Sequence, residues 1–176
     1  MKKTLIIAMC CIVALATACK KDPVDPTPEP EPEPVDYAIS YVGDYLGQFT
    51  LSVVTMNNEE VTNMNFPIDG IGMSLTKGET FNTVTATVTV DNESRQTTGT
   101  ATEAKTDFET VNLIIDKPDQ GYMFDLQLKM DGNKPNNESL VISGSFTGSG
   151  YFDFNGQHNV LDEVSGTVSG QLTKQQ

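Results

Sequence analysis

The chain has 176 residues, and its 24 acids against 11 Lys or Arg give a net charge of −13. From residue 37 onward the seven Lys or Arg are scattered singly among eighteen acids, so the basic stripe that nucleic acid binding requires is missing. These numbers exclude a nucleic acid partner, and about 140 residues are enough for one ordinary domain.

Residues 1 to 18 have the layout of a secretory signal peptide. Lys2 and Lys3 precede an almost wholly apolar stretch, from 5 to 18, that is too short to span a bilayer. The L-A-T-A-C of residues 15 to 19 resembles the lipobox of bacterial lipoproteins, in which the cysteine is acylated and becomes the new N-terminus. The resemblance implies lipid attachment at Cys19; the alternative is an ordinary signal peptide cut after A-T-A.

Lipidation at Cys19 implies a membrane partner. All three cysteines lie at or before this position, so no disulfide braces the rest of the chain. Lys20, Lys21 and Asp22 resemble the lysine-plus-acid signals that send some lipoproteins to the outer face of the outer membrane. We therefore expect an outer-membrane protein displayed on the cell surface, with attachment facing the periplasm as the alternative.

Residues 19 to 36 form the expected tether. Six prolines and six acids lie between 22 and 36, including the unbroken P-E-P-E-P-E-P of residues 28 to 34. Such a segment has too little apolar area to offset the entropy of ordering it. Extended polyproline geometry, at about 3.1 Å per residue, makes it a spacer between the membrane and a domain that starts at residue 37.

A period of two dominates residues 37 to 176. Between 81 and 90, Thr83, Thr85, Thr87 and Thr89 alternate with apolar residues, as a half-buried strand requires. No convincing amphipathic helix is present. Runs of the same kind lie at about 44–54, 61–68, 71–77, 106–116, 122–130, 139–148 and 160–173, with a weaker one near 95–103.

Turn signals separate these runs, and short connections join strands antiparallel. The sequence therefore predicts an all-β fold, an antiparallel up-and-down β-barrel of about eight to ten strands, with a β-sandwich as the alternative. The expected turns are Asn57-Asn58, Asp69-Gly70, Lys77-Gly78, Asp91-Asn92, residues 119 to 121, Asp131-Gly132 and Asn155-Gly156.

The opening V-G-D-Y-L-G-Q-F-T-L (42–51) and the closing V-S-G-T-V-S-G-Q-L (164–172) resemble the calycin-like, or lipocalin-like, lipoprotein domains of Gram-negative envelopes. The resemblance covers about residues 40 to 174 and implies a barrel that can hold a ligand. Gly43-Asp44-Tyr45 stands where lipocalins have Gly-x-Trp, and this chain has no tryptophan.

A hollow barrel would place its ligand against inward apolar side chains. Gly144, Gly148, Gly166 and Gly170 have two interpretations, either strand curvature with close backbone approach or space for that ligand. Met56, Met64 and Met73 are expected in the core rather than at a mouth. The candidate ligand-binding residues are Val84, Val88, Tyr122, Phe124, Leu126, Val164, Val168 and Leu172.

No catalytic, cofactor or metal site is predicted. His158, the single histidine, lies beside the Asn155-Gly156 turn, where a solvated loop position is expected. No second histidine or cysteine accompanies it in the domain, no serine lies in a G-x-S-x-G turn, and the acids near Asp153 and Asp162 match no calcium loop.

We therefore expect a non-catalytic, lipid-anchored envelope protein whose barrel binds a small apolar ligand. The alternative is a surface interaction or adhesin-like module that recognises protein or glycan, for which a contiguous exposed aromatic patch would be the sign. An enzyme of unfamiliar type ranks third, because it would need acids from distant loops to converge in one pocket.

Overall fold

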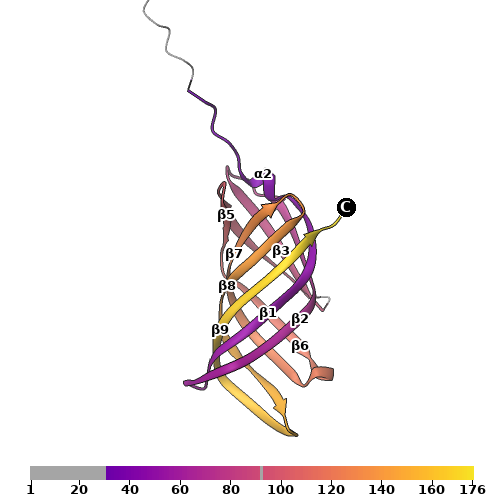
Figure 1. The fold of residues 1–176 in the computed structure, drawn as a ribbon. Helices are drawn as coiled ribbons and strands as arrows, with labels where there is room; N and C mark the ends of the chain where they lie inside the picture. The colour runs from indigo at the N-terminus through magenta and orange to yellow at the C-terminus, as the bar shows by residue number, and fades with distance from the viewer. Residues whose placement is uncertain (1–30, 92) are drawn as a thin grey trace, which may run out of the picture. The chain divides into compact units, whose positions relative to one another are not determined.

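Nine antiparallel strands form one sheet that curls into a barrel (Figure 1). Their order is β5-β4-β3-β2-β1-β9-β8-β7-β6, and a further pairing of β5 with β7 closes a ring of hydrogen bonds through eight of them. The sequence prediction of an all-β, antiparallel up-and-down barrel is therefore confirmed. The strands are β1 (Gly43–Met56), β2 (Glu59–Lys77), β3 (Thr83–Val90), β4 (Glu93–Ala101), β5 (Lys105–Phe108), β6 (Val111–Lys117), β7 (Tyr122–Asn136), β8 (Ser139–Phe154) and β9 (Gln157–Lys174).

This computed structural model describes residues 31–91 and 93–176. Residues Val35–Gln176 make one compact unit. The expected signal peptide, Cys19 and most of the expected tether lie outside the described residues. Within the described residues two short helices accompany the strands, α2 (Ala38–Tyr41) and the 3-10 turn η1 (Pro118–Gln120). Neither of these described helices is long and apolar enough to cross a membrane.

The alternation read from the sequence sorts side chains between the inside and the outside of the barrel. In β3, Val84, Ala86 and Val88 are buried, while the intervening threonines are partly exposed. In β7 every second residue from Tyr122 to Met130 is buried in the same way. The interior is thus an apolar core built by both early and late strands.

Two expected turns are strand residues instead. Gly70 has a φ of +71° and is skipped in the pairing of β1 with β2, so Asp69-Gly70 is a glycine bulge inside one long strand. Asp131-Gly132 lies within β7, where Gly132 pairs with Ile142 of β8. The turn prediction was wrong at both places because a ladder partner lay opposite each dipeptide.

The predicted strand over residues 106 to 116 is interrupted. The pairs Asp107↔Asp131 and Val111↔Leu128 differ by one residue in register, so residues 109 and 110 form an irregular step between β5 and β6. Both pieces pair with the same strand, β7, and together they occupy one position in the ring.

The late-strand glycines permit close backbone approach. A Cβ atom on Gly166 would lie 2.1 Å from the Ser52 carbonyl oxygen and 2.8 Å from the Phe146 ring. A Cβ atom on Gly170 would lie 2.5 Å from both the Gln48 carbonyl oxygen and the Phe49 ring. Neighbouring backbone and aromatic rings therefore fill the space that these glycines leave, which favours the curvature interpretation.

Alternating strand directions give the barrel two different ends. The turns after β1, β3, β6 and β8 lie at one end, which we call the hairpin end, while α2 and the turns after β2, β4 and β7 lie at the other, the α2 end (Figure 1). Residues 59 to 71 of β2 pair with β1 but not with β3, and residues 153 and 154 of β8 pair with β9 but not with β7. The β1–β2 and β8–β9 hairpins therefore extend past the closed ring at the hairpin end.

Candidate functional site

The α2 end of the barrel is sealed by the chain segment that leads into β1. Ala38 and Tyr41 of α2 are 0% and 1% exposed. The Tyr45 hydroxyl donates to the Tyr41 carbonyl oxygen at 3.0 Å, and the Tyr41 hydroxyl donates to the Thr102 carbonyl oxygen at 3.3 Å. Burial raises the pKa of both tyrosines. α2 therefore closes the interior at this end, while its own Ile39 points outward and is 63% exposed.

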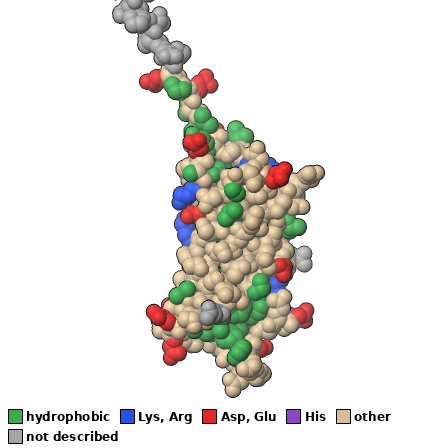
Figure 2. All heavy atoms as spheres, viewed as in Figure 1, with side chains coloured by type: hydrophobic (Ala, Val, Ile, Leu, Met, Phe, Trp, Pro, Cys, Tyr) green, Lys and Arg blue, Asp and Glu red, His purple; other side chains and the backbone are tan. Residues whose placement is uncertain are grey.

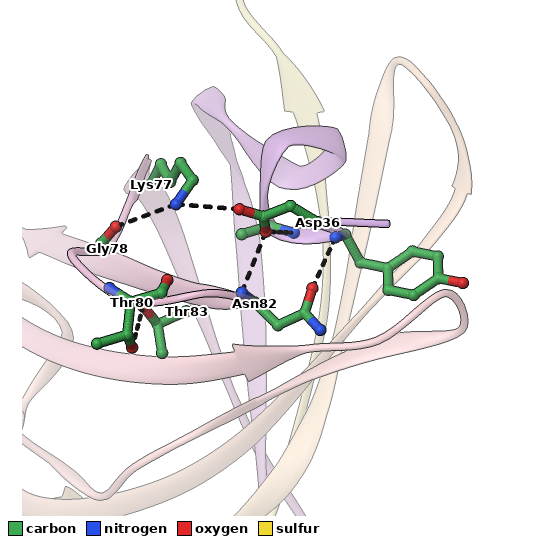
Figure 3. A network of polar contacts seen from close by, with 8 residues as sticks. Asp36, Lys77, Gly78, Thr80, Asn82 and Thr83 are labelled. Atoms are coloured by element: carbon green, nitrogen blue, oxygen red, sulfur yellow. Dashed lines mark hydrogen bonds and ion pairs between the residues drawn. The ribbon is translucent and has the colours of Figure 1, made fainter. Parts of the chain in front are cut away.

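Polar contacts fix that segment in place (Figure 3). The Asp36 carboxylate accepts from the Lys77 ammonium at 3.0 Å and from the backbone N–H groups of Asn82 at 3.1 Å and Ala38 at 3.2 Å. The Tyr37 N–H donates in turn to the Asn82 side-chain oxygen at 2.7 Å. The pKa of Asp36 lies below its ordinary value, and the largest cause is the hydrogen bond between its carboxylate and Lys77.

The hairpin end carries apolar side chains that are only partly covered. On the inward face of β8, Phe152 forms the last pair with β7 on this face and is half-buried, whereas Phe154 lies beyond that pairing and is 62% exposed. Half-buried residues of β1 and β2 lie at the same end and pack against the core. We call this group the hairpin mouth, and its residues are Met56, Val61, Met64, Phe66, Tyr122, Phe152 and Phe154.

Phe66 is at the centre of an aromatic cluster in the hairpin mouth. Its ring centroid lies 4.9 Å from that of Phe124, 5.1 Å from that of Tyr122 and 6.3 Å from that of Phe152, all edge to face. These are the separations at which aromatic pairs attract each other. The Tyr122 hydroxyl lies 3.2 Å from the Pro67 carbonyl oxygen, which ties β7 to β2 across the mouth.

Two hollows open on either side of Phe152. One has a volume of about 380 Å³ and lies between β2, the turn after β6 and the end of β8, with Met64, Phe66 and Phe154 in its walls. The other has a volume of about 460 Å³ and lies between the β1–β2 and β8–β9 hairpins, with Met56 and Val61 in its walls. Both volumes fall in the usual range for small-molecule sites, about 300–1,000 Å³.

The hairpin end is strongly acidic (Figure 2). Asp153 lines the smaller hollow and Glu59 the larger one. Arg95 and Lys117 are the described Lys or Arg side chains at this end, and they form ion pairs with Glu93 and Asp91. The acids are Glu59, Glu60, Asp69, Asp91, Glu93, Asp116, Asp119, Asp153, Asp162 and Glu163.

The negative charge extends to the aromatic cluster. Burial is the largest cause that raises the pKa of Tyr122, and the charges of Asp91 and Asp69 raise it further. In Figure 2 apolar side chains gather over the lower, hairpin end of the barrel, and acidic side chains lie at the margins of that surface. The hairpin mouth is thus an apolar depression with a negative rim.

His158 lies on the exposed β8–β9 hairpin. Its Nδ1 atom is 2.7 Å from Oδ1 of Asp153, its ring centroid is 4.5 Å from that of Tyr151, and its side chain is 56% exposed. Across residues 31–91 and 93–176 the structure groups no three His, Cys, Asp or Glu side chains in a way that could hold a metal ion.

The structure separates the eight candidate ligand-binding residues into two groups. Tyr122 lines the smaller hollow and Phe124 packs beneath Phe66. Tyr122 and Phe124 are themselves only 4% and 1% exposed. The other six are core residues away from the mouth with at most 1% of their surface exposed, namely Val84, Val88, Leu126, Val164, Val168 and Leu172. A ligand could reach those six only by displacing side chains, whereas the hairpin mouth is already accessible.

Sequence reasoning missed Phe66, Phe152 and Phe154. The signal was present, because F-D-F immediately before the Asn155-Gly156 turn continues the alternation of β8 beyond residue 148. Among the methionines expected in the core, Met73 is buried, but Met56 and Met64 line the hollows of the mouth.

No protein-family model matches the chain, and no curated protein matches it. Among solved structures it is similar to a protein of unknown function of the DUF3598 family from Nostoc punctiforme, with a TM-score of 0.43 and 8% identity over 81% of this chain. A multidomain protein including DUF1735 from Bacteroides ovatus gives a TM-score of 0.30 and 12% identity over 76% of this chain. The match covers 51% of the first of these chains and 48% of the second, about half of each.

Proposed function

We propose that the protein is a non-catalytic, lipid-anchored protein of the bacterial outer membrane that binds a small apolar ligand in its hairpin mouth. The observation that carries this proposal is the aromatic cluster around Phe66, which stays partly uncovered beside a hollow of about 380 Å³. A calycin-like barrel that holds its ligand at the open end is consistent with this arrangement.

Contact with the apolar side chains of the mouth would supply the main favourable term for binding. Each Å² of apolar surface removed from water contributes about 25 cal/mol, and association itself costs several kcal/mol. A ligand that covers Phe66, Phe152 and Phe154 gains the hydrophobic term without opening the core, because these side chains already face solvent in part.

The point where the chain enters the barrel sets the direction of the mouth. The segment at Asp36 is fixed to the β2–β3 loop at the α2 end, and the mouth is at the opposite end of the barrel. With lipid attached at Cys19 and the proline-rich stretch acting as a stalk, the hairpin mouth would face away from the membrane. We propose display on the cell surface as its location.

A second function is favoured by one further observation. Phe154 and Val160 are 62% and 60% exposed near the β8–β9 turn, beyond the smaller hollow. Exposed apolar residues at a protruding tip suit a surface module that binds a protein or glycan, which is the alternative function. A small ligand would contact the Phe66 cluster, whereas a large partner would depend mainly on the tip.

Binding of N-phenyl-1-naphthylamine, a neutral apolar fluorophore, tests the proposal. The mature chain with Cys19→Ser, which cannot be acylated, should enhance the fluorescence of the probe. Phe154→Ala should weaken binding about fivefold, the effect of losing about 1 kcal/mol of contact. Phe81→Ala is the matched control, because Phe81 is a similarly exposed phenylalanine in the loop after β2 at the α2 end.

Two results would overturn the proposal. Failure of the unmodified mouth to bind the probe would remove the ligand-binding function, and an equal loss in the Phe81→Ala variant would show that adsorption is not confined to the mouth.

Incorporation of labelled palmitate, abolished by Cys19→Ser, tests the anchor. Protease treatment of intact cells tests display, because a protected domain would contradict it.

A further inference from the structure

The lining of the hairpin mouth is apolar and also carries negative charge. Carboxylates line both hollows, Asp153 in the smaller and Glu59 in the larger. The two Lys or Arg side chains described at this end, Arg95 and Lys117, are occupied by Glu93 and Asp91. His158, in the wall of the larger hollow, has its Nδ1 atom 2.7 Å from Asp153. A ligand in either hollow therefore has apolar surface on one side and a negative carboxylate on the other.

We infer that the ligand of the hairpin mouth is an amphipathic cation, with an apolar body and a positively charged head. This inference rests on the proposed ligand-binding function and names the chemical class of its ligand. The apolar body contacts the Phe66 cluster, and the charged head lies at the rim beside Asp153 or Glu59.

Charge complementarity selects the sign of the head. The acids at the hairpin end outnumber the basic side chains there, so an approaching cation is attracted before it makes contact. The raised pKa of Tyr122, due in part to the charges of Asp91 and Asp69, reflects the same negative potential at the aromatic cluster. An anionic head of equal size would meet repulsion at both hollows.

The aromatic rings favour a cation for a second reason. The face of a phenylalanine or tyrosine ring carries partial negative charge and attracts ammonium groups within about 6 Å of its centre. Phe66, Tyr122 and Phe152 line the smaller hollow together with Asp153. A quaternary or protonated amine can therefore be attracted by rings and carboxylate at once, whereas a neutral head lacks the charge attraction and an anionic head is repelled.

Three probes with the same dodecyl chain test the inference. They are dodecyltrimethylammonium, dodecyl maltoside and dodecyl sulfate, each used below its critical micelle concentration against the mature Cys19→Ser chain, with displacement of the naphthylamine fluorophore as the readout. We expect the cation to bind about tenfold more tightly than the neutral probe at low salt, and this advantage to shrink as added salt screens the carboxylates. The anion should bind most weakly.

A double variant assigns the preference to the mouth. Asp153→Asn with Glu59→Gln keeps side-chain size and should reduce the advantage of the cation over the neutral probe to about twofold. Glu103→Gln, in the exposed turn after β4 at the α2 end, removes one carboxylate elsewhere and should change nothing.

The outcomes separate the inference from the function on which it rests. Equal binding of all three probes, or tighter binding of the anion, overturns the inference while ligand binding stands. Binding of none of them, together with no displacement of the fluorophore, overturns both. A preference for the cation that survives the double variant also overturns the inference, because the selection would then arise outside the mouth.

Discussion

The two ends of this barrel are built by the same strands and have opposite properties. At the α2 end, Ala38 and Tyr41 close the interior, and polar contacts of Asp36 hold the closing segment in place. At the hairpin end, Phe152 and Phe154 continue the inward face of β8 without a complete wall opposite them. An inward-facing apolar side chain becomes core or candidate binding surface according to what lies across from it.

The two ends of the barrel also differ in their charged side chains. Lys77, Lys134 and Lys174 lie at the α2 end, where Lys174 donates to the Val42 carbonyl oxygen at 2.7 Å and Lys134 to that of Ser40. Lys134 and Lys174 thus satisfy backbone acceptors of the segment that closes the barrel, and Lys77 pairs with the Asp36 carboxylate of that segment. At the hairpin end Asp91, Glu93 and Asp153 contact Lys117, Arg95 and His158, and the acids outnumber these basic side chains, which leaves the end with a net negative charge.

The largest expected effect is on the seal of the α2 end. Tyr41→Ala should lower the free energy of unfolding by about 3–5 kcal/mol, the range for removing a buried aromatic side chain. Tyr41→Phe should cost much less, because only the hydroxyl and its contact with Thr102 are lost. Chemical denaturation measures both; a small effect of Tyr41→Ala would mean that α2 is not part of the folded core.

The next largest loss of stability is expected where two strands approach closely at a glycine. Gly166→Ala forces a Cβ atom against the Ser52 carbonyl oxygen and should destabilise the protein by about 1–3 kcal/mol, as overpacking does. Gly72→Ala is the matched control in β2, since its nearest neighbour would be 3.6 Å away. Equal denaturation midpoints for the two variants would contradict the curvature interpretation.

Protonation of Asp36 at low pH should remove the stabilising contacts of its carboxylate. Because the folded pKa of Asp36 is lowered, chiefly by its hydrogen bond with Lys77, the carboxylate stabilises the fold above its ordinary pKa of 3.8 and loses this effect as the pH falls through the lowered value. Wild type should therefore have a higher Tm than Asp36→Asn at neutral pH. The difference should shrink as the pH falls below 3.8 and through the lowered pKa; a difference that does not change with pH would assign the effect to packing.

The smallest expected change in stability is at the hairpin mouth. Phe154→Ala should shift the free energy of unfolding by no more than about 0.5 kcal/mol, because the ring is mostly exposed and contributes little to the core. The same substitution is expected to weaken ligand binding. Thermal unfolding with and without the naphthylamine probe separates these effects, and a large loss of stability without ligand would make Phe154 a core residue.

Several features of the fold were predictable because they depend on neighbours in the sequence. The threonine–valine alternation of β3 and the Asn155-Gly156 turn each required only local patterns. Asp69-Gly70 and Asp131-Gly132 carry the same turn chemistry, yet strands β1 and β8 pair across them. The residue types of the two dipeptides favour a turn, but pairing with a distant strand keeps each of them inside a strand.

The candidate site was predictable only in part. Tyr122 and Phe124 follow from the period of β7, and the structure places them at the aromatic cluster. Phe66 and Phe152 come from strands more than 80 residues apart in the chain, so their contact depends on how the ring closes. No pattern within either strand reveals that contact.

The amino-acid sequence by itself determined that the domain is all-β, that its strands run up and down, and which face of each strand is apolar, because all three follow from a period of two and short turns. The tertiary structure decided where that apolar face is covered. Strands of unequal length leave the inward side of β2 and β8 without an opposite wall at the hairpin end, while α2 supplies one at the other end. A side chain is buried when other side chains lie close to it in space. Which strands lie opposite one another depends on strand length and register in the closed ring.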